Sequence, residues 1–197
     1  MFTQFPLFRS HLDLAHQYWT ILVRPGDTVI DATCGNGHDT LKLAQLALHS
    51  DQGQVIGIDL QEQSLLATNA RLMEHLSPDL LRRVQLICSC HSSFPDIPPK
   101  SVRLIVYNLG YLPKGDKSRT TRAKTTIESL QAAFPLLMPG GVICVTCYPG
   151  HEEGEKEEKA VLDFVRGLDP HEWCCTYQQW MNRQKAPGLL LIQRQES

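Results

Sequence analysis

A stretch near the N-terminus has the residue types of a nucleoside-binding loop. The apolar run Val29–Ile30 suits a buried strand, and it leads into a turn that carries Gly35 and Gly37. Glycines let the backbone turn tightly and approach a ligand, and a helix that follows points its N-terminal amides at the same place. The next apolar run ends in Asp59, whose carboxylate can accept hydrogen bonds from both ribose hydroxyls of an adenosine. Together these features predict a strand–helix–strand unit that holds a nucleoside.

The spacing within this loop narrows the choice of cofactor. A dinucleotide site has a third glycine three residues after Gly37, where this chain has Thr40, so NAD is disfavoured. No Gly-Lys-Ser or Gly-Lys-Thr sequence occurs, which excludes ATP binding through a loop of that type. What remains is Asp31-x-x-x-Gly35-x-Gly37 with an acid at the end of the next strand. This pattern resembles the first two motifs of class I S-adenosylmethionine-dependent methyltransferases.

A second candidate site follows the apolar run over residues 102–108. Ligands of open α/β sheets bind at the carboxyl ends of the strands, so the residues after this run should face the cofactor. The sequence there, Asn108-Leu-Gly-Tyr111, resembles the Asn-Pro-Pro-Tyr motif of amino-methyltransferases, with Leu109 and Gly110 in place of the prolines. In that motif the Asn oxygen holds the target amine and the aromatic ring stacks on the base. A nitrogen attacks a methyl sulfonium only with a free lone pair, so such a site needs an N–H acceptor, a neutral amine and in-line placement.

Helical and strand patterns alternate along the rest of the chain. The expected helices cover about residues 7–22, 38–48, 62–76, 120–137 and 154–168. The expected strands end near residue 33 and cover about residues 54–59, 84–89, 102–108, 141–148, 173–180 and 188–193. This order predicts an α/β protein of the class I methyltransferase, Rossmann-like fold. We expect a mostly parallel seven-stranded sheet with helices on both faces, closed by an antiparallel hairpin.

Composition favours one compact enzyme domain over residues 1–197. The chain is 42% hydrophobic, which suffices for a full core. Its net charge of −2 gives no global attraction to nucleic acid or membranes, so any RNA contact must come from a local patch. No apolar run approaches the ~20 residues of a membrane span, and the start lacks a secretion signal, so we expect a cytoplasmic protein.

The seven cysteines do not have the pattern of a metal site or a disulfide framework. Cys144 and Cys147 form a Cys-x-x-Cys sequence within a predicted strand, where residues three apart point to opposite faces. No second well-spaced pair completes a zinc site, and the odd count argues against a disulfide framework. We therefore predict reduced thiols and no metal.

Several motifs in order make the chain similar to the small bacterial tRNA methyltransferases that act on the wobble uridine, a family formerly grouped as rRNA methylases. The motifs are Asp31-Ala-Thr-x-Gly-Asn-Gly-His-Asp-Thr40, Asp59-x-Gln61, Asn108-Leu-Gly-Tyr-Leu-Pro-x-Gly-Asp-Lys117, Tyr148-x-Gly-His151 and Asn182-Arg-Gln-x-Ala-Pro187. The resemblance implies transfer of a methyl group from S-adenosylmethionine to the amine of 5-aminomethyl-(2-thio)uridine, giving 5-methylaminomethyl-(2-thio)uridine. Its implied partner is the anticodon arm of tRNA, and homodimer formation is left open.

The resemblance also implies roles for residues around the cofactor. Those implied to bind it are Gly35, Asn36, Gly37, Asp39, Asp59, Gln61, Cys90 and His91. Asn36, Gly37 and Asp39 would contact the methionine part, and Asp59 the ribose. Gln61 would lie along the ribose and adenine edge, with Cys90 and His91 near the adenine. Each has a simpler alternative: the Asp39 charge could merely favour a helix start, Gln61 could be a first-turn residue, and His91 a surface loop residue.

On the substrate side, the implied catalytic residues are Asn108, Tyr111 and His151. His151 could accept a proton or orient the amine, although a lone histidine is often structural. The basic residues beside the expected crevice are candidates for phosphate contacts: Lys114, Lys117, Arg119, Arg122 and Lys124. The alternative for this stretch is a solvated helix start.

Two other functions are compatible with the sequence. One is methylation of a different RNA or of a small-molecule or protein amine, which would depend little on the basic stretch. The other is a non-catalytic module that binds the cofactor and RNA. The presence of Asn108 and Tyr111 argues against this second function.

Overall fold

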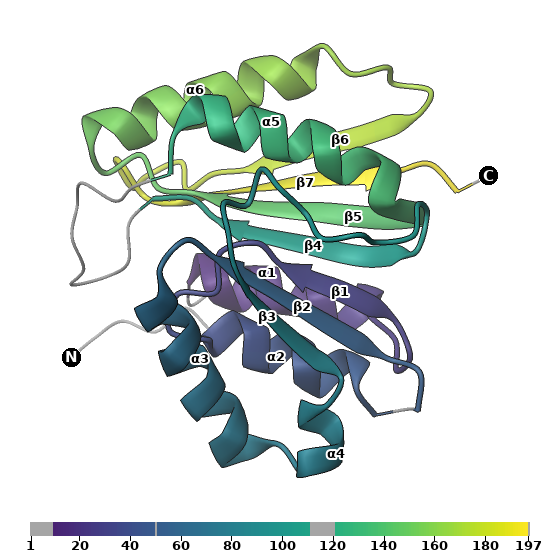
Figure 1. Ribbon diagram of the computed structural model, residues 1–197. Helices are drawn as coiled ribbons and strands as arrows, with labels where there is room; N and C mark the ends of the chain where they lie inside the picture. The colour runs from purple at the N-terminus through teal and green to yellow at the C-terminus, as the bar shows by residue number, and fades with distance from the viewer. Residues whose placement is uncertain (1–9, 50, 111–120, 197) are drawn as a thin grey trace.

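The computed structural model describes residues 10–49, 51–110 and 121–196, which form a sheet between two layers of helices (Figure 1). The strands are β1 (Thr28–Asp31), β2 (Gln54–Asp59), β3 (Val84–Cys88), β4 (Val102–Asn108), β5 (Leu137–Cys147), β6 (Trp173–Gln178) and β7 (Gly188–Arg194). Their order across the seven-stranded sheet is β3-β2-β1-β4-β5-β7-β6. The pairs from β3 to β5 are parallel, and β7 runs antiparallel to both β5 and β6. The predicted fold class is confirmed, including the closing hairpin.

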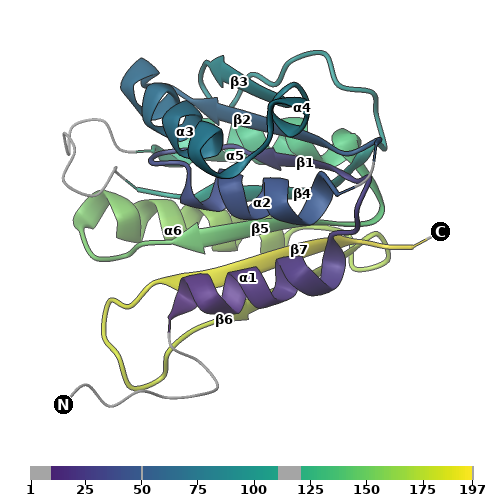
Figure 2. The ribbon, with the colours of Figure 1, turned by 90° about the horizontal axis from the view of Figure 1, so that it is seen from below.

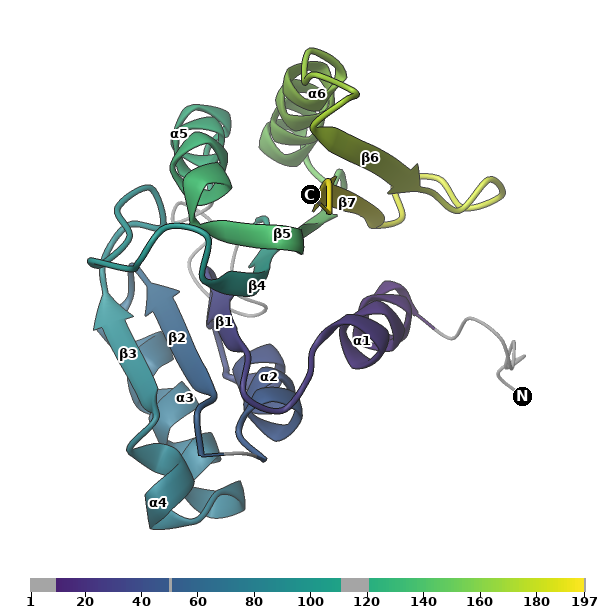
Figure 3. The same ribbon diagram turned by 90° about the vertical axis from the view of Figure 1, so that its right-hand side faces the viewer.

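Helices cover both faces of this sheet (Figures 2 and 3). One face carries α1 (His11–Leu22), α2 (His38–Ala47) and α3 (Glu62–His75), and the other carries α5 (Ala123–Ala133) and α6 (Glu152–Arg166). A short α4 (Pro78–Leu81) precedes β3, and a 3-10 turn (Phe134–Leu136) precedes β5. Within the described ranges, no helix is long and apolar enough to cross a membrane.

Along most strands, successive side chains alternate between two apolar clusters. On β1, Val29 packs with the α1 and α2 side of the sheet, and Ile30 packs with the α5 and α6 side. On β5, Cys144 lies in the first cluster and Cys147 in the second. The prediction that these two cysteines face opposite ways is confirmed, because a strand turns successive side chains to opposite faces.

The first helix is fixed across the middle of the sheet. Ser10 caps its start, its hydroxyl accepting from the Asp13 amide at 3.1 Å. The fully buried Ala15 and Trp19 form its apolar stripe, which packs over β4 and β7. This stripe holds the N-terminal end of α1 near the end of β5, where His11 reaches Tyr148.

The structure corrects two boundaries. The helix expected over residues 120–137 is α5 followed by the 3-10 turn at Phe134–Leu136, because Pro135 has no N–H to continue an α-helix. Strand β5 begins at Leu137, before the Pro139–Gly141 turn from which it was expected to start. Val102 pairs with Leu137, whereas two residues later the partner is already Val142. The turn is therefore a bulge within the strand.

Candidate active site

The loop between β1 and α2 turns at two glycines. Gly35 and Gly37 have φ angles of +53° and +75°, in the region that glycine adopts without steric cost. A Cβ atom on Gly37 would lie 2.7 Å from the Cα atom of Thr68 on α3, so a larger residue would push the loop away. Arg71 on α3 also donates to the Asn36 carbonyl at 2.7 Å. The loop is thus held against α3, with the first amides of α2 at the edge of the sheet.

Asp59, at the end of β2, is tied to this loop. Its Oδ2 atom accepts from the Gly35 amide and its Oδ1 atom from the Gln61 amide, each at 2.9 Å. A carboxylate can accept about four hydrogen bonds, so about two acceptor positions remain. That number matches the two ribose hydroxyls of a nucleoside. Gln61 is the N-cap residue of α3, but its side chain makes no capping bond. The side-chain amide can therefore contact a ligand.

The segment after β3 packs against β4 and α5 through His91. His91 is only 8% exposed, and its ring packs edge-on against Tyr107 with the centroids 5.9 Å apart. Its burial lowers the pKa of His91, partly opposed by the Asp59 charge. Cys90 is half-buried and its sulfur accepts from the Ser92 hydroxyl at 3.1 Å. His91 is therefore not a surface loop histidine, and its contact with adenine stays a prediction.

Asp31 ends β1 as a fully buried carboxylic acid. Its Oδ2 atom accepts from the Thr40 hydroxyl at 2.6 Å and its Oδ1 atom from the Thr33 amide at 3.1 Å. Burial and the nearby Asp39 charge raise the pKa of Asp31 to about 7, although both hydrogen bonds act in the opposite direction. Thr40, which replaces the third glycine of a dinucleotide loop, thus links α2 to β1.

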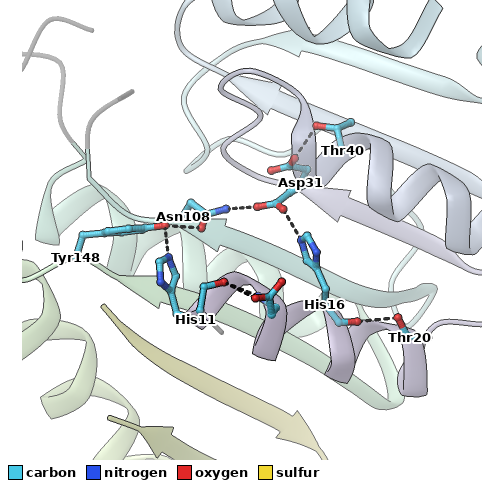
Figure 4. A network of polar contacts seen from close by, with 10 residues as sticks. His11, His16, Thr20, Asp31, Thr40, Asn108 and Tyr148 are labelled. Atoms are coloured by element: carbon cyan, nitrogen blue, oxygen red, sulfur yellow. Dashed lines mark hydrogen bonds and ion pairs between the residues drawn. The ribbon is translucent and has the colours of Figure 1, made fainter. Parts of the chain in front are cut away.

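Asn108, at the end of β4, has a fixed orientation. Its Nδ2 atom donates to Asp39 Oδ2 at 2.6 Å, and His16 Nε2 lies 2.7 Å from the other oxygen, Asp39 Oδ1. Its backbone amide donates to Thr33 Oγ1 at 2.8 Å. A flipped amide would place Oδ1 against the Asp39 carboxylate, so this pairing turns the Asn108 oxygen the other way. Figure 4 shows Asn108 near the centre of the network, joined to Tyr148 on one side and, through the Asp39 carboxylate, to His16 on the other.

Tyr148 and His11 extend the network toward the start of α1. The Tyr148 hydroxyl lies 3.4 Å from Asn108 Oδ1 and 3.0 Å from His11 Nε2 (Figure 4). The rings of His11 and Tyr148 meet edge to face, with centroids 5.3 Å apart. Burial lowers the pKa of His11 and raises that of Tyr148, so both are neutral near pH 7. The Tyr148 hydroxyl is thus in position to donate to Asn108 Oδ1, and His11 contacts the same hydroxyl from α1.

His151 caps a helix in the structure. It is the N-cap residue of α6, and its Nδ1 atom accepts from the Gly154 amide at 3.1 Å. That bond satisfies one of the free amides at the start of α6. This capping contact is the structural alternative to catalysis, and the catalytic role stays a prediction.

A buried glutamate on α6 holds the segment that leads into α5. Glu157 is 2% exposed, and it accepts from the hydroxyls of Thr121 and Thr126, each at 2.6 Å. The Thr121 hydroxyl in turn accepts from the Gly110 amide at 2.7 Å, and the Thr121 amide donates to the Gly110 carbonyl at 3.1 Å. Burial raises the pKa of Glu157, with the two threonine bonds opposing. Residues 110 and 121 are thus joined directly after the end of β4.

Part of the predicted substrate side lies outside the described residues, namely Tyr111, Lys114, Lys117 and Arg119. Of the remaining basic residues, Arg122 is the exposed N-cap residue of α5. Lys124 has an 88% exposed side chain and lies 3.9 Å from Glu128. Such an exposed pair contributes little to stability, and contact of Lys124 with a phosphate stays a prediction.

The sequence reasoning missed several members of the site. Tyr148 was part of a quoted motif and follows a predicted strand, so its position at the sheet edge could have assigned it. His11 and His16 had no such signal, because a histidine in an amphipathic helix is usually structural. Their role depends on where α1 packs.

The fold and site together define a class I methyltransferase that uses S-adenosylmethionine. The carboxyl ends of β1, β2, β4 and β5 bring a glycine loop, a ribose-type acid and an oriented amide to one edge of the sheet. Solved methyltransferases of low identity share this architecture, such as an O-methyltransferase from Thermotoga maritima with a TM-score of 0.67 and 14% identity.

The chain belongs to the family described as "Putative rRNA methylase", whose model matches residues 55–194. It is 38% identical, over 94% of its length and 69% of the relative, to a chloroplastic tRNA (mnm(5)s(2)U34)-methyltransferase of Arabidopsis thaliana. The structure of a "putative rRNA-methylase" from Clostridium thermocellum superposes with a TM-score of 0.86 and 37% identity, covering 95% of this chain and 98% of that one. A methyltransferase structure from Streptococcus mutans in complex with SAH gives a TM-score of 0.80 and 31% identity, covering 95% and 99%.

Proposed function

We propose that this protein methylates the amine of 5-aminomethyl-(2-thio)uridine at the wobble position of tRNA, giving 5-methylaminomethyl-(2-thio)uridine. The observation that carries this proposal is the fixed Asn108 amide, whose oxygen can accept from an N–H at the end of β4. The name of the plant relative, a tRNA methyltransferase for the wobble nucleoside mnm5s2U, supports the substrate.

The described residues fit S-adenosylmethionine. When bound, this cofactor supplies an electrophilic methyl group on a sulfonium. The remaining acceptor positions of Asp59 suit its ribose, and the left-handed Gly35 and Gly37 open the backbone to its methionine part. Asp39, 9% exposed near the loop, adds negative charge that favours a cationic ligand. We propose that Asn36 contacts the methionine part of the cofactor with Asp39, that Gln61 lies along the ribose and adenine edge, and that Cys90 and His91 lie near the adenine.

The target amine needs acceptors that leave its lone pair free. Asn108 Oδ1 and the Tyr148 hydroxyl lie 3.4 Å apart, so both can contact one amine nitrogen. The two contacts would use its N–H bonds and direct the lone pair toward the methyl group. We propose that Tyr111 stacks on the uracil ring, as the motif implies.

The experiment that tests this function uses cells and purified protein. In cells that lack the protein, mass spectrometry of tRNA nucleosides should show the aminomethyl form of the wobble uridine in place of the methylaminomethyl form. Purified protein should restore the methyl group to that tRNA. Equal methylation of the free nucleoside or of unrelated amines would instead point to a different amine substrate.

We further propose that the anticodon arm contacts the basic stretch Lys114–Lys124. Neutralising Lys117, Arg119 and Arg122 together should raise KM for tRNA and reduce the salt dependence by about one unit of slope per lost contact. A matched control neutralises Lys156, Lys159 and Arg166, which form ion pairs on the exposed side of α6. If both triple variants keep wild-type tRNA kinetics across a salt series, the tRNA binds another surface.

A further inference from the structure

The proposed reaction must release one proton. An aminomethyl group in water is mostly a primary ammonium ion, which has no lone pair to attack with. In the balanced reaction the ammonium loses a proton, its nitrogen forms the new C–N bond, and the S–CH3 bond breaks with its electron pair remaining on sulfur. The products are a secondary ammonium, a thioether and the proton. A group near Asn108 must therefore accept that proton.

We propose that His11 on α1 accepts this proton through the hydroxyl of Tyr148, which makes His11 a positioning and proton-accepting residue of the site. This inference rests on the proposed function. Tyr148 Oη lies 3.4 Å from Asn108 Oδ1, where the amine is expected, and 3.0 Å from His11 Nε2. Figure 4 shows Tyr148 joined to both Asn108 and His11. Asn108 comes from the end of β4, Tyr148 follows β5, and His11 begins α1.

The hydrogen-bonding capacity of Tyr148 fits a relay. A tyrosine hydroxyl carries one proton and accepts through its oxygen. The hydroxyl donates to Asn108 Oδ1 at 3.4 Å in the structure, and His11 Nε2 lies closer, at 3.0 Å. Once the amine occupies Asn108 Oδ1 and His11 is in its Nδ1–H tautomer, the hydroxyl turns to donate to Nε2 and keeps its lone pairs toward the amine. The ammonium proton that faces Tyr148 can then pass to Oη while the hydroxyl proton passes to Nε2. Rotation about the C–N bond of the aminomethyl group then turns the freed lone pair toward the methyl group and an N–H toward Tyr148. Tyr148 ends as it began, so its raised pKa is no obstacle.

The surroundings of His11 keep it neutral and ready to accept. Its burial lowers its pKa below the ordinary 6.5, and this outweighs the opposing charges of Asp39 on α2 and Asp13 on α1. His16, the other titratable group on this part of α1, faces Asp39. On the side of β6, His11 borders the uncharged Gln178, Gln179 and Trp180.

The neighbouring acids are less suited to the task. Both carboxylate oxygens of Asp39 are occupied, one by His16 and the other by Asn108. Asp31 is fully buried and bonded to Thr40 and Thr33. His11 is half-buried and reaches the substrate side through a single hydroxyl, so it combines access with a neutral resting state.

The test compares pH profiles of single-turnover methyl transfer to aminomethyl-uridine tRNA for wild type, His11→Gln, Tyr148→Phe and the exposed control His171→Gln. At pH 7 we expect His11→Gln and Tyr148→Phe to be slower by about a hundredfold or more. Their deficit should shrink as pH rises toward 9.5, because bulk water then deprotonates the amine. Imidazole should partly restore a His11→Ala variant. His171→Gln should follow wild type.

A second readout does not depend on activity. In 15N-labelled wild-type protein, NMR should show His11 Nε2 without a proton at pH 7.5 and gaining one with a midpoint below 6.5. A deficit that is the same at every pH, or a His11 that carries its proton on Nε2 at pH 7.5, would overturn the relay. Wild-type protein that transfers no methyl group to the aminomethyl tRNA would refute the proposed function instead.

Discussion

Replacing Asp59 by Asn tests how the end of β2 binds the cofactor. The carboxylate already accepts from the amides of Gly35 and Gln61, at 2.9 Å each, which leaves about two acceptor positions for the ribose. An asparagine keeps one oxygen and presents an NH2 group where the second oxygen was. The variant should therefore lose one charge-assisted bond to a ribose hydroxyl, worth about 1.5–3 kcal/mol.

This loss corresponds to roughly 10- to 150-fold weaker binding. Asp59→Ala removes both ribose bonds and should weaken binding by about 3–6 kcal/mol, if the two bonds add. Asp59→Asn also leaves one of the Gly35 and Gln61 amides without its acceptor, and Asp59→Ala leaves both, so the thermal midpoints of both variants should fall while the fold is kept.

Isothermal titration calorimetry with S-adenosylhomocysteine measures the effect. Glu62→Gln is the matched control, because Glu62 is a nearby exposed carboxylate at the start of α3, and it should bind as wild type does. NAD should give no heat with any of them. Wild-type affinity in both Asp59 variants would show that this carboxylate only holds the loop, and would refute the count of acceptor positions.

Three further predictions concern chemistry, stability and the entry to α5. Asn108→Ala should bind S-adenosylmethionine nearly as wild type does and lose most of its kcat, since the amide acts on the reacting amine; an active variant would remove it from that role. The pKa of Asp31 is raised from 3.8 to about 7 in the folded state, so between these pH values the folded protein binds a proton that the unfolded chain does not. The wild-type free energy of unfolding should therefore fall by up to about 4 kcal/mol between pH 4 and 7. Urea unfolding at several pH values should show that Asp31→Asn lacks this decrease with pH. A variant whose free energy of unfolding changes with pH as the wild type does would contradict the assignment. Glu157→Ala removes the acceptor of Thr121 and Thr126 and should destabilise the protein by about 2–4 kcal/mol. Glu153→Ala on the exposed side of α6 is its control, and equal unfolding midpoints in the two would refute the role of Glu157.

The sequence alone determined the parts of this protein whose signals are local. The left-handed turn at Gly35 and Gly37 favours glycine, so the sequence alone predicts it. The alternation of apolar runs with helical patterns determined the strands, and parallel strands place their carboxyl ends on one edge. That reasoning put Asp59 and Asn108 on the same side of the sheet, where the structure has them.

Only the tertiary structure decided what surrounds the Asn108 amide. His11 and Tyr148 are 137 positions apart in the chain, yet their side chains meet at 3.0 Å. The contact exists because Trp19 and Ala15 bury α1 against β4 and β7, and β7 reaches that place only by pairing antiparallel with β5. Side-chain patterns along one helix report which face is buried, but not against which strands. A histidine on α1 therefore acquires its chemical role from long-range packing.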